Sequence, residues 1–388
     1  MPEHPFFQHI VVHGLPYDRG FSYGEQTKEK IRRNVTFYKQ SGKLGPWLSV
    51  LRVISECYIP GLQLYWPSGW EEMRGVAAGA GVTIEEIVML NARYDLSHVK
   101  FDADESIDAA EECTSTIVLA SATRERVVFT AQNWDMSHRL VTEDAIIYLE
   151  IHPDPSENIP SMFLVTEAGQ LGRSGFNGAG LGLTANSLQS DIDLLPDLST
   201  PIPPSGALRR LFLEQSSYSG GLKSISRTPR HVSCNIMVSS AEDIGICLEV
   251  TPQKIFRAVI SSASDKAYIV HSNHFQTGAY QSQTQVTDTY LGGSSWYRGE
   301  RLEAGLREQA LKENLTENDV LAAFKDHAGY PHSLCEHFVG KKNATEDSGP
   351  YCGPTSTVCC VLYNLSKRTL QVCKGCPCEG VFQEFALL

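Results

Sequence analysis

The sequence has no concentration of positive charge. Its 33 Lys and Arg residues are outnumbered by 45 Asp and Glu residues, which gives a formal net charge of -12, and no block of basic residues occurs. Proteins that bind phosphate backbones need clustered Lys and Arg. We therefore predict that the chain has no nucleic-acid partner.

Long apolar segments are also missing. No run of about 18 apolar residues is present, so we expect no membrane-spanning helix and no membrane partner. Residues 1–30 lack the apolar core of a signal peptide, and the 11 cysteines are odd in number, which indicates reduced thiols. The last residues, Ala386-Leu387-Leu388, lack the basic middle residue of a peroxisomal tail. These absences predict a cytoplasmic protein.

Strands and helices are predicted in separate groups, without internal repeats. Hydrophobic residues make up 42% of the chain, enough for a large core. Runs rich in Val, Ile, Thr and Phe predict strands at 8–13, 114–120, 126–132, 145–152, 162–168, 232–239, 245–251, 267–272, 355–363 and 368–373. Helices are predicted at about 18–40, twice within 67–94, and at 206–226, 297–310 and 316–327. This order is typical of a layered α+β sandwich.

Two stretches between these elements have unusual composition. Residues 99–112 are rich in Asp and Glu and are predicted to form a solvated loop. Residues 172–182 are rich in glycine, but no strand, G-x-G-x-x-G and helix arrangement surrounds them. We interpret this glycine-rich stretch as tight turns with close backbone approach and not as a nucleotide-binding loop.

Cys113 opens the β-branched run that follows the acidic stretch. If the peptide bond between Glu112 and Cys113 is broken, Cys113 carries both a thiol and an α-amino group with an ordinary pKa of roughly 7.7 to 8.0. One residue then supplies the nucleophile and an adjacent base. We therefore hypothesise that the chain cleaves itself before Cys113 and that the acidic loop exposes the scissile bond.

Two further motifs supply polar partners for Cys113. Asp135 ends the next predicted strand, and an antiparallel hairpin would bring it back to orient the new amine. Asn133 lies two residues earlier and shares a face with Asp135 if the strand is regular. Asn273 ends another strand-like run, and its amide would donate to a tetrahedral oxyanion, a role worth about 2.7 to 4 kcal/mol in other enzymes.

Each of these residues also has a purely structural interpretation. Free cysteines are among the most buried residues, so Cys113 alone is consistent with an inert core position. Asp135 would then be a turn residue at the end of a strand, and Asn273 would be a loop cap. We interpret His271 and His274 as partners in local hydrogen bonds and not as metal ligands.

The cysteines near the C-terminal end are the remaining candidates for a metal. Cys373, Cys376 and Cys378 form a Cys-x2-Cys-x-Cys cluster. The second cysteine pair that zinc spacing requires is lacking, although Cys359 and Cys360 lie on the neighbouring predicted strand. The prediction is that the chain binds no metal.

Several motifs together resemble one known family. They occur in the order Cys113-Thr114-Ser115, Gln132-Asn133-Trp134-Asp135, Thr166-Glu167-Ala168-Gly169, Gly175-Phe176-Asn177 and His271-Ser272-Asn273-His274. With these motifs the chain resembles the acyl-coenzyme A:6-aminopenicillanic acid acyltransferase (isopenicillin N acyltransferase) family. The likeness runs from residues 14–24 through residues 85–93 to the last predicted hairpin.

The resemblance implies the αββα four-layer sandwich of N-terminal nucleophile hydrolases. It also implies an inactive precursor that cleaves itself into two chains forming one globular unit. Residues 1–112 would be a mainly helical α chain, and residues 113–388 would be a β chain that begins with the catalytic cysteine.

The same resemblance implies roles for individual residues. Cys113 would be the nucleophile, Asp135 and Asn273 would support it, and Ser233 and Ser333 fall in segments that hold substrate-binding serines. Such enzymes move an acyl group through a cysteine thioester from acyl-coenzyme A, a co-substrate and not a bound cofactor, to a penicillin nucleus. The small-molecule partners would be an acyl donor and an amine.

One position departs from the family pattern. The penicillin enzymes cleave after Gly, whereas Glu112 precedes Cys113 here. A side chain at this position changes the conformations open to an N-to-S acyl shift. Two other hypotheses therefore stand beside the acyltransferase: an amidohydrolase with water as acceptor, and an unprocessed relative without catalytic activity.

Overall fold

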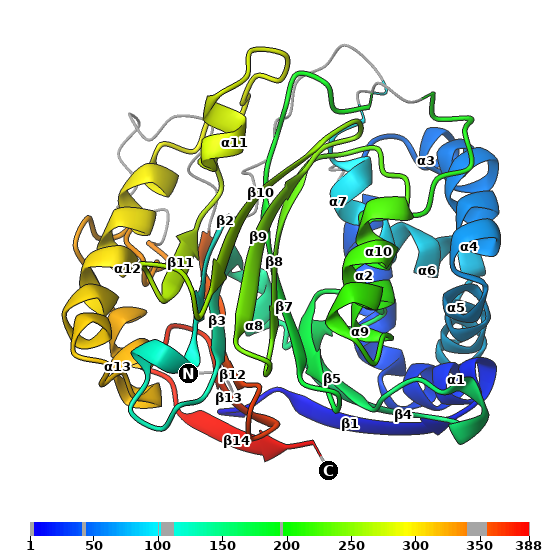
Figure 1. Cartoon of the computed structure of the whole chain (residues 1–388). Helices are drawn as coiled ribbons and strands as arrows, with labels where there is room; N and C mark the ends of the chain where they lie inside the picture. The colour runs from blue at the N-terminus through cyan, green and yellow to red at the C-terminus, as the bar shows by residue number, and fades with distance from the viewer. Residues whose placement is uncertain are drawn as a thin grey trace.

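Two stacked β-sheets form the centre of the structure, and helices cover both outer faces (Figure 1). The computed structural model describes residues 4–40, 44–99, 101, 112–194, 197–339 and 355–387. The predicted acidic loop lies outside the described residues except for 99, 101 and 112. No helix of the described part is long and apolar enough to cross a membrane.

The larger sheet has eight strands in the order β1-β4-β5-β6-β7-β8-β9-β10. The strands are β1 (Gln8–Gly14), β4 (Ile146–Pro153), β5 (Met162–Glu167), β6 (Ser174–Asn177), β7 (Leu181–Ser187), β8 (Cys234–Ser240), β9 (Ile244–Val250) and β10 (Ile255–Ser261). The β1 and β4 strands pair in parallel, and the other neighbours in this sheet are antiparallel.

The smaller sheet has six antiparallel strands in the order β11-β2-β3-β12-β13-β14. They are β2 (Glu112–Val118), β3 (Phe129–Ser137), β11 (Tyr268–His271), β12 (Thr355–Asn364), β13 (Thr369–Lys374) and β14 (Phe382–Ala386). The terminal hairpin of β12 and β13 was predicted from the sequence.

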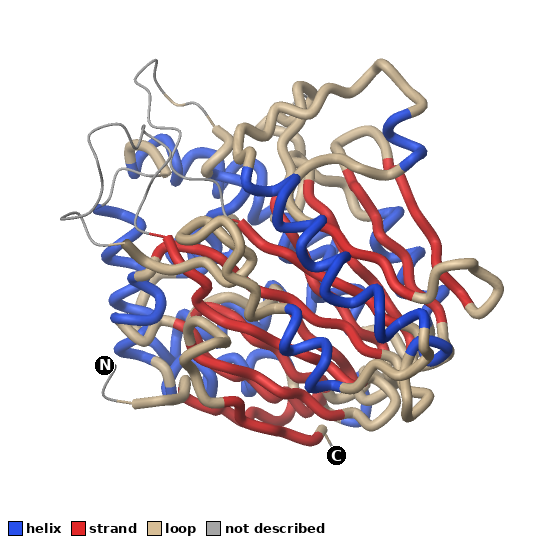
Figure 2. The backbone as a smooth tube through the Cα atoms, turned by 90° about the vertical axis from the view of Figure 1, so that its left-hand side faces the viewer, coloured by secondary structure: helices blue, strands red, loops and turns tan. Residues whose placement is uncertain are grey.

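Helices form the two outer layers. One layer contains α1 (Pro16–Gln26), α2 (Lys28–Gln40), α3 (Trp47–Val53), the π-helical turn η1 (Ile54–Tyr58), α4 (Ile59–Tyr65), α5 (Pro67–Ala80), α6 (Ile84–Asn91), α7 (Arg93–Leu96), α9 (Ser205–Leu213) and α10 (Tyr218–Arg227). The other contains α12 (Ser294–Leu311) and α13 (Glu317–Ala323), which lie across the smaller sheet in the view of Figure 2. The short segments are η2 (Ala120–Ala122), α8 (Arg139–Thr142), η3 (Pro155–Glu157) and α11 (Gly278–Gln281).

The alternation of side chains along β12 shows how the layers are joined. Cys359 and Val361 pack between the two sheets, in a cluster that includes Tyr148 of the larger sheet. Cys360 and Leu362 point the other way and pack with apolar residues of α12 and α13. Because alternate residues of a strand face opposite sides, one strand contributes to two apolar layers. The expected αββα arrangement is confirmed.

Two capping boxes mark helix starts within the regions where the sequence predicts helices. Thr83 accepts a hydrogen bond from the backbone of Glu86 at the start of α6, and Thr316 does the same with Asp319 at the start of α13. Such caps satisfy backbone N–H groups that have no partner inside the helix. The boundaries of these two helices are therefore set by local sequence.

The glycine-rich stretch from 172 to 182 was predicted as turns, and this is only partly correct. It contains β6 and the start of β7. A Cβ on Gly175 would lie 2.4 Å from the backbone oxygen of Phe163 in the paired strand β5, so the close backbone approach is real. Gly180, with φ of +84°, makes the predicted turn between β6 and β7.

Candidate active site

Cys113 lies on β2, directly beside β3. The register of this antiparallel pair sets Cys113 opposite Trp134 and Glu112 opposite Asp135, which confirms the predicted pairing. Because opposite residues share a face of the sheet, the Cys113 side chain points with Trp134 into the layer between the sheets. The carboxyl groups of Glu112 and Asp135 lie on the other face, toward α12.

The thiol of Cys113 has a cationic neighbour. Its side chain is buried, with 1% of the residue exposed. Arg173 Nη2 lies 3.6 Å from Cys113 Sγ, and the Arg173 guanidinium lies 3.6 Å from the centre of the Trp134 ring. A positive charge beside a thiol favours its thiolate form. No motif in the sequence pointed to Arg173, which lies between β5 and β6.

The main chain of Cys113 is held by Asn273. The backbone nitrogen of Cys113 donates to Asn273 Oδ1 at 2.8 Å, while Asn273 Nδ2 donates to the carbonyl oxygen of Ser187 at 3.1 Å. Asn273 lies two residues after the end of β11, which pairs with β2 in the smaller sheet. In this arrangement the Asn273 amide accepts from Cys113, whereas the sequence-based hypothesis gave it the role of a donor.

Arg298 of α12 connects the polar groups of the site. It is buried, and its guanidinium donates to the Cys113 carbonyl oxygen at 2.8 Å, to Thr114 Oγ1 at 2.6 Å and to Asn273 Oδ1 at 2.9 Å. A guanidinium offers donors in a fixed planar fork, which suits several acceptors at once. No motif revealed Arg298; the only signal was an arginine on the buried side of a predicted helix.

Glu112 is an ordered residue of β2, and its assignment to a solvated loop was wrong. Tyr290 Oη donates to Glu112 Oε1 at 3.1 Å, and Ser294 Oγ donates to Oε2 at 2.8 Å. Arg298 Nη2 lies 3.1 Å from Oε2, and 21% of the Glu112 side chain is exposed. Three donors compensate for partial burial of the charge. The residue before the expected scissile bond is therefore fixed in place.

Asp135 is buried beneath the same arginine. Thr357 Oγ1 donates to Asp135 Oδ1 at 2.6 Å, and Arg298 Nη1 lies 3.9 Å from Oδ2. Burial raises the pKa of Asp135 well above its ordinary value, and repulsion from Glu336 adds to this effect, which outweighs the attraction of Arg298. Asp135 consequently keeps its proton to a higher pH than a solvated aspartate.

The remaining sequence candidates have structural contacts. Asn133 donates to the carbonyl oxygens of Phe324 and Leu334. Ser233 Oγ donates to Asp193 Oδ1, and Ser333 Oγ donates to the Cys335 carbonyl oxygen; both serines are buried. Among the contacts of the described residues, neither serine meets Cys113. Their substrate-binding role stays a prediction.

His271 and His274 take part in local hydrogen bonds, as predicted. His271 Nε2 lies 3.0 Å from Glu249 Oε1, and His274 Nδ1 lies 2.8 Å from Ser295 Oγ. The first pair is buried. These contacts fix the end of β11, from which Asn273 reaches Cys113.

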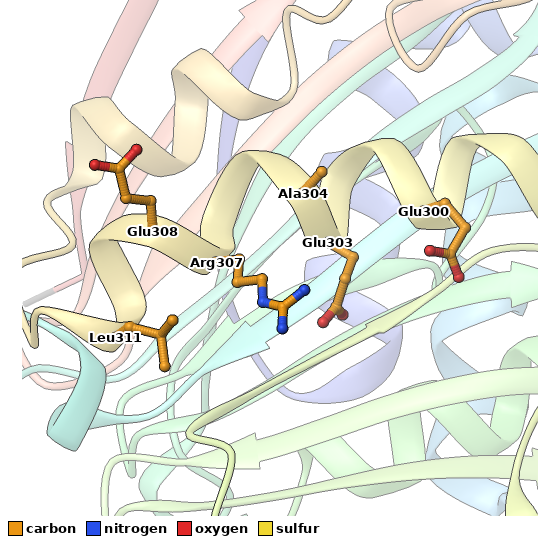
Figure 3. A pocket seen from close by; sticks show the side chains of 6 residues that line it. All are labelled: Glu300, Glu303, Ala304, Arg307, Glu308 and Leu311. Atoms are coloured by element: carbon orange, nitrogen blue, oxygen red, sulfur yellow. The ribbon is translucent and has the colours of Figure 1, made fainter.

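A surface depression along α12 lacks the chemistry of the site. Figure 3 shows its lining residues Glu300, Glu303, Ala304, Arg307, Glu308 and Leu311, all from that helix. No nucleophilic side chain is among them. The candidate active site is therefore placed at Cys113, whose thiol lies beside the Arg173 guanidinium and whose main chain is held by Asn273 and Arg298.

Comparisons with known proteins identify the family of the chain. The model of the family described as acyl-coenzyme A:6-aminopenicillanic acid acyl-transferase matches residues 122–378. The 40 kDa form of acyl-coenzyme A:6-aminopenicillanic-acid-acyltransferase from Emericella nidulans is 27% identical over 339 residues, which are 86% of each chain.

Solved structures give weaker likenesses. A mutant of conjugated bile acid hydrolase from Clostridium perfringens aligns with a TM-score of 0.45 and 10% identity, over 71% of this chain and 97% of that one. Penicillin V acylase from Agrobacterium tumefaciens aligns with a TM-score of 0.37 and 11% identity, over 67% of this chain and 82% of that one.

Proposed function

The chain belongs to the acyl-coenzyme A:6-aminopenicillanic acid acyl-transferase family, and from this premise we propose a specific activity. The protein is a self-processing cysteine N-terminal nucleophile enzyme that moves acyl groups from acyl-coenzyme A to an amine such as 6-aminopenicillanic acid. It also hydrolyses amides as a side activity. We place it in penicillin-type secondary metabolism in the cytoplasm.

One observation supports this proposal most strongly. The backbone nitrogen of Cys113, which cleavage would turn into a free amine, already has a fixed acceptor in Asn273 at 2.8 Å. The amine, which shares Cys113 with the thiol, would therefore have a hydrogen-bond partner that fixes its position after cleavage. That geometry is what a nucleophile and a base on one residue require.

Self-cleavage would begin at the carbonyl carbon of Glu112. The Cys113 thiolate attacks this carbon, the carbon–nitrogen bond breaks, and the leaving nitrogen takes a proton to become the α-amine. Water then attacks the resulting thioester, which restores the thiol and leaves a carboxyl group on Glu112. Arg173, at 3.6 Å from Cys113 Sγ, supports the attacking thiolate.

Acyl transfer would use the same sulfur. The Cys113 thiolate attacks the thioester carbonyl of acyl-coenzyme A, coenzyme A leaves as a thiol, and the acyl group stays on Cys113. An amine then attacks this second thioester, an amide forms, and the Cys113 thiol is restored. Water in place of the amine gives hydrolysis, so the relative rates depend on exclusion of water from the site.

The anchors of Glu112 suggest where a substrate carboxylate would bind. After cleavage Glu112 is the last residue of its chain, and its departure would release the hydroxyl groups of Tyr290 and Ser294 together with Arg298. Two hydroxyl donors and a guanidinium suit a carboxylate. The penicillin nucleus carries one, which agrees with an amine acceptor of that class.

The test is incubation of the processed enzyme with phenylacetyl-coenzyme A and 6-aminopenicillanic acid, followed by product detection. The expected results are an N-acylated penicillin nucleus and free coenzyme A, both absent with Cys113→Ser. Amide hydrolysis without transfer would instead identify an amidohydrolase. Absence of both reactions from a processed chain would refute the proposal.

A further inference from the structure

Four metal-ligating side chains converge away from Cys113. They come from three segments: His327 follows α13, Cys335 and His337 lie in the loop before β12, and Cys378 lies between β13 and β14. Their ligand atoms all lie within 4.8 Å of one another. Two imidazoles and two thiols make the donor set of a Cys2His2 zinc site.

The distances between these atoms approach those of a tetrahedron. With zinc–sulfur bonds of about 2.3 Å and zinc–nitrogen bonds of about 2.05 Å, the edges are about 3.8 Å for S···S, 3.6 Å for S···N and 3.3 Å for N···N. The two sulfurs are 3.6 Å apart. His337 Nε2 lies 3.7 Å from Cys335 Sγ, 3.3 Å from Cys378 Sγ and 3.1 Å from His327 Nε2.

We propose that these four side chains bind one zinc ion as a structural site. All four positions of a tetrahedral ion are filled by the protein, so no position is left for a substrate or a reactive water. Both thiols release a proton when the metal binds. The metal would connect the segment before β12, which carries His327, Cys335 and His337, to Cys378, which follows β13.

The surroundings of His337 fit a metal ligand. Its Nε2 atom faces the cluster, and its other ring nitrogen, Nδ1, lies 3.8 Å from Glu379 Oε1. At this distance the carboxylate makes no direct hydrogen bond, but its negative charge favours a cation in the neighbouring cluster. The ring also packs against Tyr330, with 5.5 Å between the ring centres.

A disulfide between the two cysteines is the competing explanation. The sulfurs of Cys335 and Cys378 are 3.6 Å apart, well beyond the disulfide length of about 2.05 Å. The two imidazole Nε2 atoms lie 3.1 Å apart beside these sulfurs, a separation that an N–H···N hydrogen bond also gives, but such a bond does not involve the two thiols. A shared cation accounts for all four orientations.

The prediction of no metal is thus replaced by a site that no single motif encodes. In the Cys-x2-Cys-x-Cys cluster, Cys373 Sγ contacts the Lys374 carbonyl oxygen and Cys376 Sγ contacts that of Glu336. Only Cys378 joins the ligand set, and Cys335, its partner, is 43 residues away. Folding, and not sequence spacing, brings the ligands together.

The proposed zinc would also brace the candidate active site. Glu336 lies between two of the ligands, and its backbone nitrogen donates to Thr357 Oγ1 at 2.9 Å. The same Thr357 hydroxyl donates to Asp135. Fixing the ligand loop therefore fixes the hydrogen bond to Asp135. The metal would act by holding the ligand loop in place and would contact no reacting atom.

The test measures metal content of the full chain, purified without an affinity tag that binds metals and under reducing conditions. Elemental analysis should find about one zinc per chain. Cys335→Ser and Cys378→Ser should lower this content at least tenfold. Cys57→Ser is the matched control and should keep the metal, because the buried Cys57 thiol donates to the carbonyl oxygen of Thr200, away from the four ligands.

Two further measurements keep the proposal falsifiable if the cysteine variants fail to fold. His327→Gln changes the exposed ligand and should weaken zinc retention against a chelator at least tenfold while the chain stays folded. Cobalt in place of zinc should give the visible spectrum of a tetrahedral thiolate site. The proposal is overturned by a folded chain that takes up neither metal with both thiols reduced, or by a native Cys335–Cys378 disulfide.

Discussion

The backbone nitrogen of Cys113 and the side-chain oxygen of Asn273 are joined by a hydrogen bond of 2.8 Å across 160 residues of sequence. This bond ties β2, the strand of the proposed nucleophile, to the segment that follows β11. It also places an acceptor at the atom that becomes an amine in the proposed processing. The proposed processing therefore depends on Asn273 as much as on the thiol.

Asn273→Ala should lower the rate of acyl transfer by at least about tenfold, because the Cys113 nitrogen loses its hydrogen-bond acceptor. Asn133→Ala is the matched control, because Asn133 donates to the carbonyl oxygens of Phe324 and Leu334 and should affect stability instead. Steady-state kinetics and thermal unfolding separate the two effects. Equal losses of activity per folded molecule would contradict the special role of Asn273.

Arg298→Lys should slow processing by at least about tenfold. A lysine keeps the charge but has one nitrogen, which cannot serve the Cys113 carbonyl, Thr114 and Asn273 at the same time. Arg301→Lys, one turn later and paired with Asp326, should process at the normal rate. Gel densitometry of precursor during expression measures both rates, and equal rates would refute the positioning role.

The elements set by local sequence could be predicted. Two helix starts depend only on nearby residues, because Thr83 and Thr316 cap α6 and α13. The strands β2 and β12 are likewise indicated by their own β-branched residues. Edge strands were missed. β14 contains only two large apolar residues, Phe382 and Phe385, and β10 is rich in apolar residues but is interrupted by Arg257 and exposes Val259. The predicted helix at 206–226 is two helices, separated at residues 214–217.

The site divides in the same way. Cys113, Asp135 and Asn273 lie in recognisable sequence motifs. Arg173 and Arg298 do not, because each reaches Cys113 only when the sheets and α12 are assembled. The sequence does not show which of its arginines lie near Cys113. Only the structure therefore reveals the positive charges around the thiol and its main chain.

Asp135→Asn should stabilise the chain increasingly as pH rises. The folded pKa of Asp135 is raised, so its proton stabilises the fold at low pH. Above about pH 3.9 the Asp135 side chain is ionised in the unfolded chain but still protonated in the folded chain. The free energy of unfolding of the wild type therefore falls, relative to that of the variant, by about 1.4 kcal/mol per pH unit until the pH reaches the folded pKa. Urea unfolding at pH 5 and pH 7, in a Cys113→Ala background, measures this difference.

Asp326→Asn provides the control of opposite sign. A hydrogen bond from Arg301 lowers the pKa of Asp326, so this carboxylate stabilises the fold above about pH 3.9, and its contribution is lost only as pH falls through the lower folded pKa. Its variant should be less stable than wild type by the same amount at pH 5 and pH 7. A pH-independent effect of Asp135→Asn would show that Asp135 is ionised in the fold.

Glu112→Ala should slow self-cleavage by about tenfold, because the hydrogen bonds that fix the residue before the scissile bond are lost. Glu125→Ala, which removes an exposed partner of Lys367, should leave cleavage unchanged. Timed electrophoresis of newly synthesised chain gives both rates. Faster cleavage after removal of the Glu112 side chain would show that the anchored carboxylate restrains processing.

Mass spectrometry of the purified wild-type chain tests self-processing at Cys113 most directly. The account predicts two chains, the second beginning at Cys113, and a single intact chain for Cys113→Ala. An intact wild-type species of 42.8 kDa that also fails to label at Cys113 with a thiol-reactive acyl donor would contradict it.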